Sequence, residues 1–173
     1  MNPTALFLGD SITASFNLLK YFPSYSFINK AVSGDSTTEC LARIDKSFFN
    51  VKFDFVFLCI GTNDLARDRE NNEIVRNIEN IISKLSEYTQ RTTIVLTTIF
   101  PTRDNVPRPN SRIIQINDLL KEKVEILEIV FLNLYYHFID LEGKLKEEFT
   151  EDGLHLTEIA YTKWANELGL FFK

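Results

Sequence analysis

Short apolar runs alternate with longer segments of helical period along this chain. The runs are rich in β-branched and aromatic residues, which is typical of buried strands. We expect five strands, at residues 5–8, 26–29, 53–60, 93–99 and 130–134. Apolar residues recur three or four positions apart in residues 74–88 and 113–127, and again in residues 156–171, where a C-terminal helix should begin just after His155. Alternating strands and helices predict an α/β fold with one doubly wound, five-stranded parallel sheet.

Length and composition fit a single domain over residues 1–173. A chain of 173 residues with 45% hydrophobic and 13% aromatic content can fill a substantial core. No internal repeat, low-complexity tract or change in composition marks a second domain. Cys40 and Cys59 lack the spacing of a metal or redox motif, so we expect two buried free thiols.

Charge and hydropathy limit the classes of partner and the cellular location that we expect for this protein. The formal net charge is −5, and no stretch rich in lysine and arginine could follow a phosphate backbone, which argues against nucleic acid. No apolar run approaches the roughly 20 residues that span a bilayer. No basic and apolar leader precedes the first expected strand. We therefore expect a cytoplasmic protein without a membrane span, and its oligomeric state stays open.

Four short polar motifs interrupt the hydrophobic pattern. They are Gly9-Asp10-Ser11, Val32-Ser33-Gly34-Asp35, Gly61-Thr62-Asn63-Asp64 and Asp152-Gly153-Leu154-His155. The first three follow the first, second and third expected strands, and the carboxyl ends of parallel strands share one sheet edge. The fourth follows the fifth strand and can return to that edge. The topology therefore predicts that all four motifs meet there.

The residues in these motifs fit nucleophilic catalysis. A serine hydroxyl needs a base to take its proton, and a neutral imidazole does so near neutral pH. Ser11 is the candidate nucleophile and His155 the candidate base. Asp152, three residues before His155, can hold the imidazole in the required tautomer. The backbone N–H groups of Ser11 and Gly34 and the side-chain amide of Asn63 are candidate oxyanion donors.

Each motif alone also has a structural explanation. Residues 10–11 and 34–36 could cap the helices that follow them. Residues 61–64 and Asp152-Gly153 are rich in turn formers. Four unrelated turns, however, give no reason for a hydroxyl, an imidazole, a carboxylate and an amide to gather at one edge. We therefore favour the catalytic interpretation.

Two other interpretations of the polar residues are weaker. His137, the second histidine, has no carboxylate in the Asp152 to His155 spacing and is interpreted as structural or pocket-lining. The acidic residues and histidines lack a helix-spaced ligand pair or cysteine cluster, so we expect no metal. The absence of Gly-x-Ser-x-Gly around Ser11 argues against the nucleophile elbow of α/β-hydrolases.

Together the motifs resemble the four blocks of the SGNH hydrolases, also called GDSL-type esterases and lipases. The matching segments cover nearly the whole chain and are residues 6–13, 29–35, 60–64 and 152–156. The resemblance implies a flavodoxin-like three-layer α/β/α sandwich and no cofactor. It also implies that Ser11, Asp152 and His155 form the catalytic triad and that Ser11, Gly34 and Asn63 form the oxyanion hole.

Two positions depart from the pattern of that family. Ala31 stands where many members have glycine in the second block, and Ala160 precedes Tyr161 where a Gly-Tyr pair is common. Neither position carries the expected chemistry.

The resemblance implies a serine esterase acting on a small-molecule substrate with a short acyl or acetyl group. Platelet-activating-factor-acetylhydrolase-like enzymes and carbohydrate O-acetylesterases are the most similar members. A lysophospholipase or thioesterase is the alternative, which the 15 phenylalanines favour weakly. A non-catalytic binding domain is less favoured because the serine, asparagine and histidine are all retained. The irregular stretch Pro101 to Arg112 is either a plain connector or a border of the substrate pocket.

Overall fold

The computed structural model describes residues 2–89 and 91–172. Its centre is a five-stranded sheet with all strands parallel, in the order β2-β1-β3-β4-β5. The strands are β1 (Thr4–Gly9), β2 (Ser26–Asn29), β3 (Phe55–Cys59), β4 (Thr93–Thr97) and β5 (Val130–Leu132). This is the flavodoxin-like order, which confirms the expected fold class.

Three of the strands end earlier than the apolar pattern predicts. The expected strands at residues 53–60, 93–99 and 130–134 continue past the hydrogen-bonded β3, β4 and β5. Ile60, Ile99 and Leu134 lie beyond these strands but are buried. An apolar run in the sequence indicates which side chains are buried, whereas a strand ends where its backbone pairing ends. The end of the apolar run and the end of the strand therefore differ.

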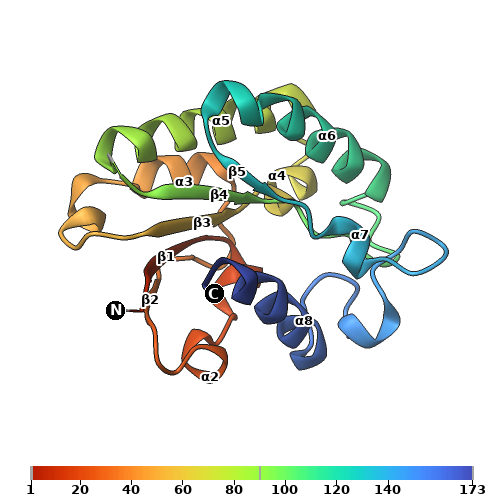
Figure 1. The fold of residues 1–173 in the computed structure, drawn as a ribbon. Coiled ribbons are helices and arrows are strands. Elements are labelled where there is room, and N and C mark those ends of the chain that lie inside the picture. Colours follow the sequence, from red (N-terminus) through yellow and green to blue (C-terminus); the bar gives the residue numbers. More distant parts are fainter. Residues whose placement is uncertain (1, 90, 173) are drawn as a thin grey trace.

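Helices cover both faces of the sheet (Figure 1). One face carries α3 (Thr37–Arg43), α5 (Asn71–Tyr88) and α6 (Asn110–Leu127). The other carries α8 (Glu158–Leu168) with the short α1 (Ser11–Ala14) and α2 (Leu18–Tyr21). The remaining short elements are α4 (Thr62–Ala66), α7 (Tyr135–Phe138) and the 3₁₀ segments η1 (Lys46–Phe49), η2 (Glu147–Phe149) and η3 (Gly169–Phe172). None of the described helices is long and apolar enough to cross a membrane.

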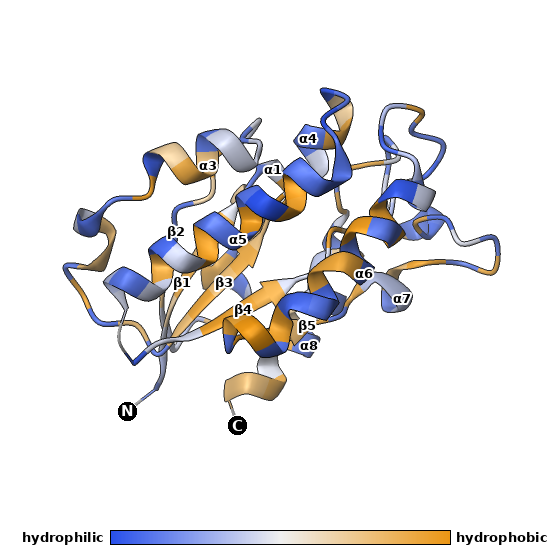
Figure 2. Cartoon of the chain, turned by 90° about the horizontal axis from the view of Figure 1, so that it is seen from above, coloured by the Kyte–Doolittle hydropathy of each residue, from blue (hydrophilic) through white to orange (hydrophobic). Residues whose placement is uncertain are grey.

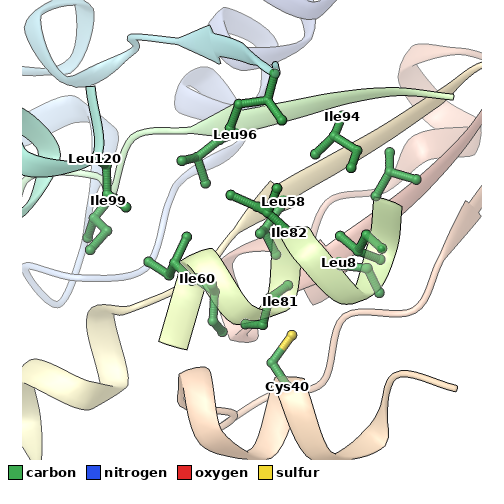
Figure 3. Packing of buried hydrophobic residues seen from close by; sticks show 14 of the residues in the cluster. Leu8, Cys40, Leu58, Ile60, Ile81, Ile82, Ile94, Leu96, Ile99 and Leu120 are labelled. Carbon is green, nitrogen blue, oxygen red and sulfur yellow. The ribbon is translucent and has the colours of Figure 1, made fainter. Parts of the chain in front are cut away.

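The two faces of the sheet have separate cores because successive strand side chains point to opposite sides. Leu8, Leu58 and Leu96 pack against Ile81 and Ile82 of α5, as Figure 3 shows. The strands β3 and β4 are mostly hydrophobic, whereas α5 alternates between hydrophobic and hydrophilic residues (Figure 2). This agrees with a helix that buries one face only.

The core under α8 is aromatic. Phe7 stacks on Phe57 with ring centroids 4.9 Å apart, and Phe16 stacks on Trp164 at 4.6 Å. These rings anchor α8 and α1 to the sheet. Aromatic pairs contribute about 0.5–1.5 kcal/mol beyond the area they bury. The segment that follows β1 is therefore held firmly against the C-terminal helix.

Capping residues start the helices at the polar motifs. Asp10 accepts a hydrogen bond from the Ile12 N–H at 3.0 Å and starts α1, and Ser36 stands before α3 with its own N–H bound to Glu39 at 2.8 Å. Both expected caps are confirmed. The C-terminal helix starts at Glu158, slightly later than expected, because Thr157 occupies its N-cap. The motifs themselves thus remain at the strand ends.

Candidate active site

Ser11, His155 and Asp152 form a continuous chain of polar contacts at the carboxyl edge of the sheet. Ser11 Oγ lies 3.0 Å from Nε2 of His155, and Nδ1 of the same ring lies 2.6 Å from Oδ2 of Asp152. Ser11 opens α1 directly after β1, while the other two residues come from the loop before α8. The fold therefore joins groups that are 144 residues apart in the sequence.

The turn that carries His155 is closed by its own carboxylate. Asp152 Oδ1 accepts hydrogen bonds from the N–H groups of Leu154 at 2.9 Å and His155 at 2.7 Å, leaving Oδ2 for the imidazole. Gly153 has φ +81°, and a Cβ there would lie 2.1 Å from the carbonyl oxygen of Arg103. The Arg103 N–H in turn donates to the Gly153 carbonyl at 2.8 Å. Only glycine fits this close approach without strain.

Hydrogen bonding keeps Asp152 ionised. Burial by itself would raise the pKa of Asp152, but hydrogen bonds from the His155 ring and from the N–H groups of His155 and Leu154 lower it to about 2. The carboxylate is therefore charged at any pH at which His155 could act as a base. A charged acceptor at Nδ1 leaves Nε2 of His155 free to accept the proton of Ser11.

The candidate oxyanion donors lie in the two adjacent loops. Gly34 has φ +87°, and the Asn63 side-chain N–H₂ donates to the carbonyl of Asp35 at 2.9 Å, which ties the second motif to the third. Among the described residues, neither the N–H of Ser11 nor that of Gly34 has a hydrogen-bond acceptor. Two backbone N–H groups without protein acceptors are what a developing oxyanion requires.

Two arginines that the motifs do not include hold these loops. Arg67 donates to the Gly34 carbonyl at 3.0 Å. Arg108 donates through Nε to the Thr62 carbonyl at 3.1 Å and through Nη2 to Oδ1 of Asn63 at 3.3 Å. Because Arg108 donates to Oδ1, the amide nitrogen of Asn63 has to face the other way. Sequence reasoning missed both contacts, although Arg108 lies in the irregular stretch that it singled out.

The stretch from Pro101 to Arg112 therefore contacts both halves of the site. Arg108 reaches the third motif through Asn63, and the backbone of Arg103 pairs with Gly153 in the fourth. Within the stretch, Thr102 Oγ1 donates to the Arg108 carbonyl at 2.7 Å. Of the two interpretations left open for this segment, contact with the site is the one that its hydrogen bonds favour.

Two buried aspartates support the site without joining the polar chain. Asp10 is only 2% exposed, and burial raises its pKa to about 7 although the Ile12 N–H opposes the shift. Asp64 is fully buried and accepts from the Thr37 N–H at 2.8 Å and the Thr37 hydroxyl at 2.6 Å. Asp64 thus ties the third motif to α3.

The remaining candidates lie apart from the polar chain. His137 sits on α7 with Nδ1 3.5 Å from Glu167, so the fold does not bring it to Ser11. Cys40 and Cys59 are buried free thiols, as expected. In residues 2–89 and 91–172, no group of three metal-ligating side chains is gathered in one place.

The surface beside His155 is an open hollow. Its walls are Glu151, Asp152, His155, Leu156 and Thr157. A larger hollow lies at the opposite edge of the sheet, where β3 and β4 begin, and contains none of the motif residues. We assign the chemistry to the first because its walls include Asp152 and His155, and the His155 ring contacts Ser11.

Comparison with known proteins gives the family of this chain. A model of the GDSL-like Lipase/Acylhydrolase family matches residues 7–163. A Streptococcus pneumonia protein provisionally named a platelet activating factor is 30% identical, with a TM-score of 0.93 over 100% of this chain and 85% of that chain. A GDSL-like lipase from Bacteroides thetaiotaomicron shares the fold at 20% identity, with a TM-score of 0.85 over 98% of this chain and 87% of that chain.

A curated relative carries a different name. An N-acylneuraminate cytidylyltransferase from Streptococcus agalactiae is 30% identical over 168 residues, which is 96% of this chain. This chain spans only 38% of the length of that relative. The likeness therefore concerns one part of a longer protein. Taken with the family match over most of the sequence, the fold and the arrangement of the four motifs, these comparisons show that the chain belongs to the GDSL-like lipase/acylhydrolase family of ester-bond hydrolases.

Proposed function

We propose that this protein is a serine esterase that hydrolyses short-chain acyl or acetyl esters through an acyl-enzyme at Ser11. The observation that carries the proposal is the polar chain from Ser11 Oγ through His155 to Asp152, with contacts of 3.0 and 2.6 Å. In this proposal Ser11, His155 and Asp152 are the catalytic residues. The oxyanion donors are the N–H groups of Ser11 and Gly34 and the amide of Asn63.

Acylation follows from this arrangement. Ser11 Oγ bonds to the acyl carbon while its proton passes to Nε2 of His155, and the carbonyl electron pair moves onto oxygen. The oxyanion donors stabilise that negative charge. When the intermediate collapses, the bond to the alcohol oxygen breaks and the alcohol takes the proton from His155.

Deacylation repeats the same steps with water as the nucleophile. His155 takes a proton from water as its oxygen bonds to the acyl carbon, and then returns that proton to Ser11 Oγ as the acid leaves. Asp152 stays ionised throughout because its pKa is held at about 2 by the hydrogen bonds described above. No cofactor is needed for any of these steps.

The surroundings of Ser11 favour a short acyl group. A long acyl chain needs an enclosed site with apolar walls, whereas the hollow beside His155 is open and Leu156 is the one apolar residue in its walls. Phenylalanines that could have lined an acyl tunnel, including Phe7, Phe16 and Phe57, are packed in the core under α8. These observations favour an acetyl or similar ester over the lysophospholipase or thioesterase alternative.

The relatives suggest two substrate types within this class. One similar structure is named after platelet activating factor, and an acetyl xylan esterase shares the fold at 18% identity with a TM-score of 0.81. The name N-acylneuraminate cytidylyltransferase also refers to a sugar. We do not extend cytidylyl transfer to this chain, because the chain spans only 38% of the length of that relative. A platelet-activating-factor-like ester and a sugar acetate are both proposed substrates.

The test is hydrolysis of p-nitrophenyl acetate, butyrate and octanoate by the wild type and by Ser11→Ala. We expect the highest kcat/KM for acetate and a loss of roughly 10⁶ in Ser11→Ala. A phosphonate inhibitor should add its mass at Ser11. Undiminished hydrolysis in Ser11→Ala, with circular dichroism showing that the variant is folded, would rule the mechanism out. A maximum at octanoate would instead favour the long-chain alternative.

A further inference from the structure

Arg108 is a half-buried cation beside the candidate oxyanion hole whose hydrogen-bond partners are all neutral. It donates to the Thr62 carbonyl at 3.1 Å, to Oδ1 of Asn63 at 3.3 Å and to Oδ1 of Asn105 at 3.3 Å. A guanidinium group has five N–H donors in a planar fork. These contacts use three, so two N–H donors remain for another acceptor.

The other half-buried arginines of the chain have carboxylate partners. Arg43, Arg69, Arg103 and Arg112 pair with Asp35, Asp64, Asp140 and Asp68, respectively. Within residues 2–89 and 91–172, no carboxylate oxygen lies within ion-pair distance of Arg108. A partly buried charge without a counter-ion is costly, and such a group is expected to be paired. Arg108 is the exception to the pattern of its own protein.

The nearest carboxylates do not fill this role. Asp10 and Asp152 act on Arg108 only through space, and loss of water on burial lowers the pKa of Arg108. Asp152 is already bound to the His155 ring and to two backbone N–H groups. Asp10, with a pKa of about 7, carries only part of a charge near neutral pH. Arg108 is therefore left with a positive charge that no fixed anion balances.

The backbone around Arg108 is held in place before any ligand arrives. Its carbonyl accepts from Thr102 Oγ1 at 2.7 Å, and its N–H donates to the Asn105 carbonyl at 2.9 Å. Asn110 fixes the same loop by accepting from the Thr102 N–H at 2.8 Å and donating to the Thr102 carbonyl at 2.9 Å. A preorganised guanidinium loses less conformational freedom when it binds.

We propose that Arg108 binds an anionic group, a carboxylate or a phosphate, that the ester substrate carries near its scissile bond. The enzyme then prefers acidic esters to neutral esters of the same shape. One N–H on Nη1 and one on Nη2 remain for the two oxygens of such a group. This inference rests on the proposed esterase function and adds a substrate class to it.

The test compares three acetyl esters that differ in one substituent. They are 3-acetoxybenzoate, 3-acetoxyphenyl phosphate and the neutral 3-acetoxybenzamide. We expect wild-type kcat/KM to be about 10- to 100-fold higher for at least one anionic ester than for the amide. The carboxylate and phosphate esters together show which oxyacid is preferred. Arg108→Gln should bring the anionic-to-neutral ratio close to one, and Arg108→Lys should keep part of it.

Arg112→Gln is the matched control. Arg112 is half-buried in the same region but pairs with Asp68, so its loss should leave the anionic-to-neutral ratio unchanged. The ratio is the decisive quantity because any disturbance of Asn63 lowers the hydrolysis of all three esters together. An equal fall for all three in Arg108→Gln would overturn the inference and leave Arg108 only as a residue that positions Asn63. A wild type without preference would also overturn it.

Binding separates this inference from the esterase proposal. Titration of Ser11→Ala with intact 3-acetoxybenzoate reports recognition without turnover, and adding Arg108→Gln should weaken that binding about 10-fold or more. Weakened binding without any wild-type hydrolysis would contradict the esterase but support the anion site. If the wild type hydrolyses the acetyl ester of 3-acetoxybenzamide and Arg108→Gln does not weaken binding, the esterase would be supported and the anion site contradicted.

Discussion

The two halves of the candidate site are held together in different ways. The half that carries His155 is a local structure in which Asp152 binds the backbone of its own turn and the imidazole. The oxyanion half is held from a distance, since Asn63 depends on Asp35 and on Arg108, 45 residues away. We therefore expect that substitutions in the His155 half abolish proton transfer, whereas substitutions in the oxyanion half lower the rate only in part.

Removing the base should have the largest effect. Among the described residues, His155 is the one group in contact with Ser11 Oγ that can take its proton, so we expect His155→Ala to lower kcat about 10⁶-fold. Asp152→Asn should cost less, about 10⁴-fold, because the asparagine removes the charge that orients the ring but leaves the imidazole. Steady-state kinetics with p-nitrophenyl acetate measures both. Equal or reversed losses would mean that another group holds the imidazole.

Removing one donor from the oxyanion half should have a smaller effect. Asn63→Ala should lower kcat about 10²–10³-fold with little change in KM, since the donor acts on charge that develops in the transition state. The Ser11 and Gly34 N–H groups remain in this variant. The same esters measure it, and a rise in KM with unchanged kcat would place Asn63 in ground-state binding instead.

A pair of glycine variants compares the rigidity of the two halves. Gly153→Ala meets both a positive φ and a carbonyl oxygen 2.1 Å from the new Cβ, so it should cost about 3 kcal/mol of unfolding free energy or more. Gly34→Ala has a similar φ of +87° but nothing within 4 Å of the new Cβ, so it should cost only about 1–2 kcal/mol. Urea unfolding measures both. Equal costs would show that the Arg103 backbone yields easily.

The last prediction concerns how the stability of the fold depends on pH through Asp10. Because burial raises its pKa to about 7, the folded protein holds this proton more tightly than the unfolded chain does. Its stabilising contribution is complete below pH 3.8 and disappears as pH rises through 7. Asp10→Asn should therefore gain in Tm relative to the wild type by roughly 10 degrees between pH 4 and pH 8, which thermal unfolding at the two pH values measures. Asp152, with its lowered pKa, contributes in the opposite direction, and its contribution is lost as pH falls from 3.8 to about 2.

The sheet was predictable because buried strands appear in the sequence as short runs of apolar residues. All five strands were anticipated, and β2 was predicted with the observed bounds. The errors fell at strand ends such as Ile99, where an apolar side chain stays buried after backbone pairing has stopped. Asp10 and Ser36 were anticipated as caps because capping is a local interaction between neighbouring residues.

The supporting arginines could not be predicted in the same way. Arg67 and Arg108 look like ordinary charged residues in sequence, and their roles depend on carbonyls that come from other loops. The need for glycine at position 153 is similar, because the atom that excludes a side chain belongs to Arg103. Contacts of this kind have no spacing that a single sequence could reveal.

The sequence by itself determined the order of strands and helices, the caps at the motifs and the set of reactive groups, because these follow from local periodicity and residue chemistry. Only the tertiary structure decided that Ser11 meets His155 at 3.0 Å and that Arg108 reaches Asn63. It also decided that Arg108 has no carboxylate partner among the residues the structure describes. These are distances between residues far apart in the chain. They depend on how the loops pack at the sheet edge, and the packing is set by the whole core together.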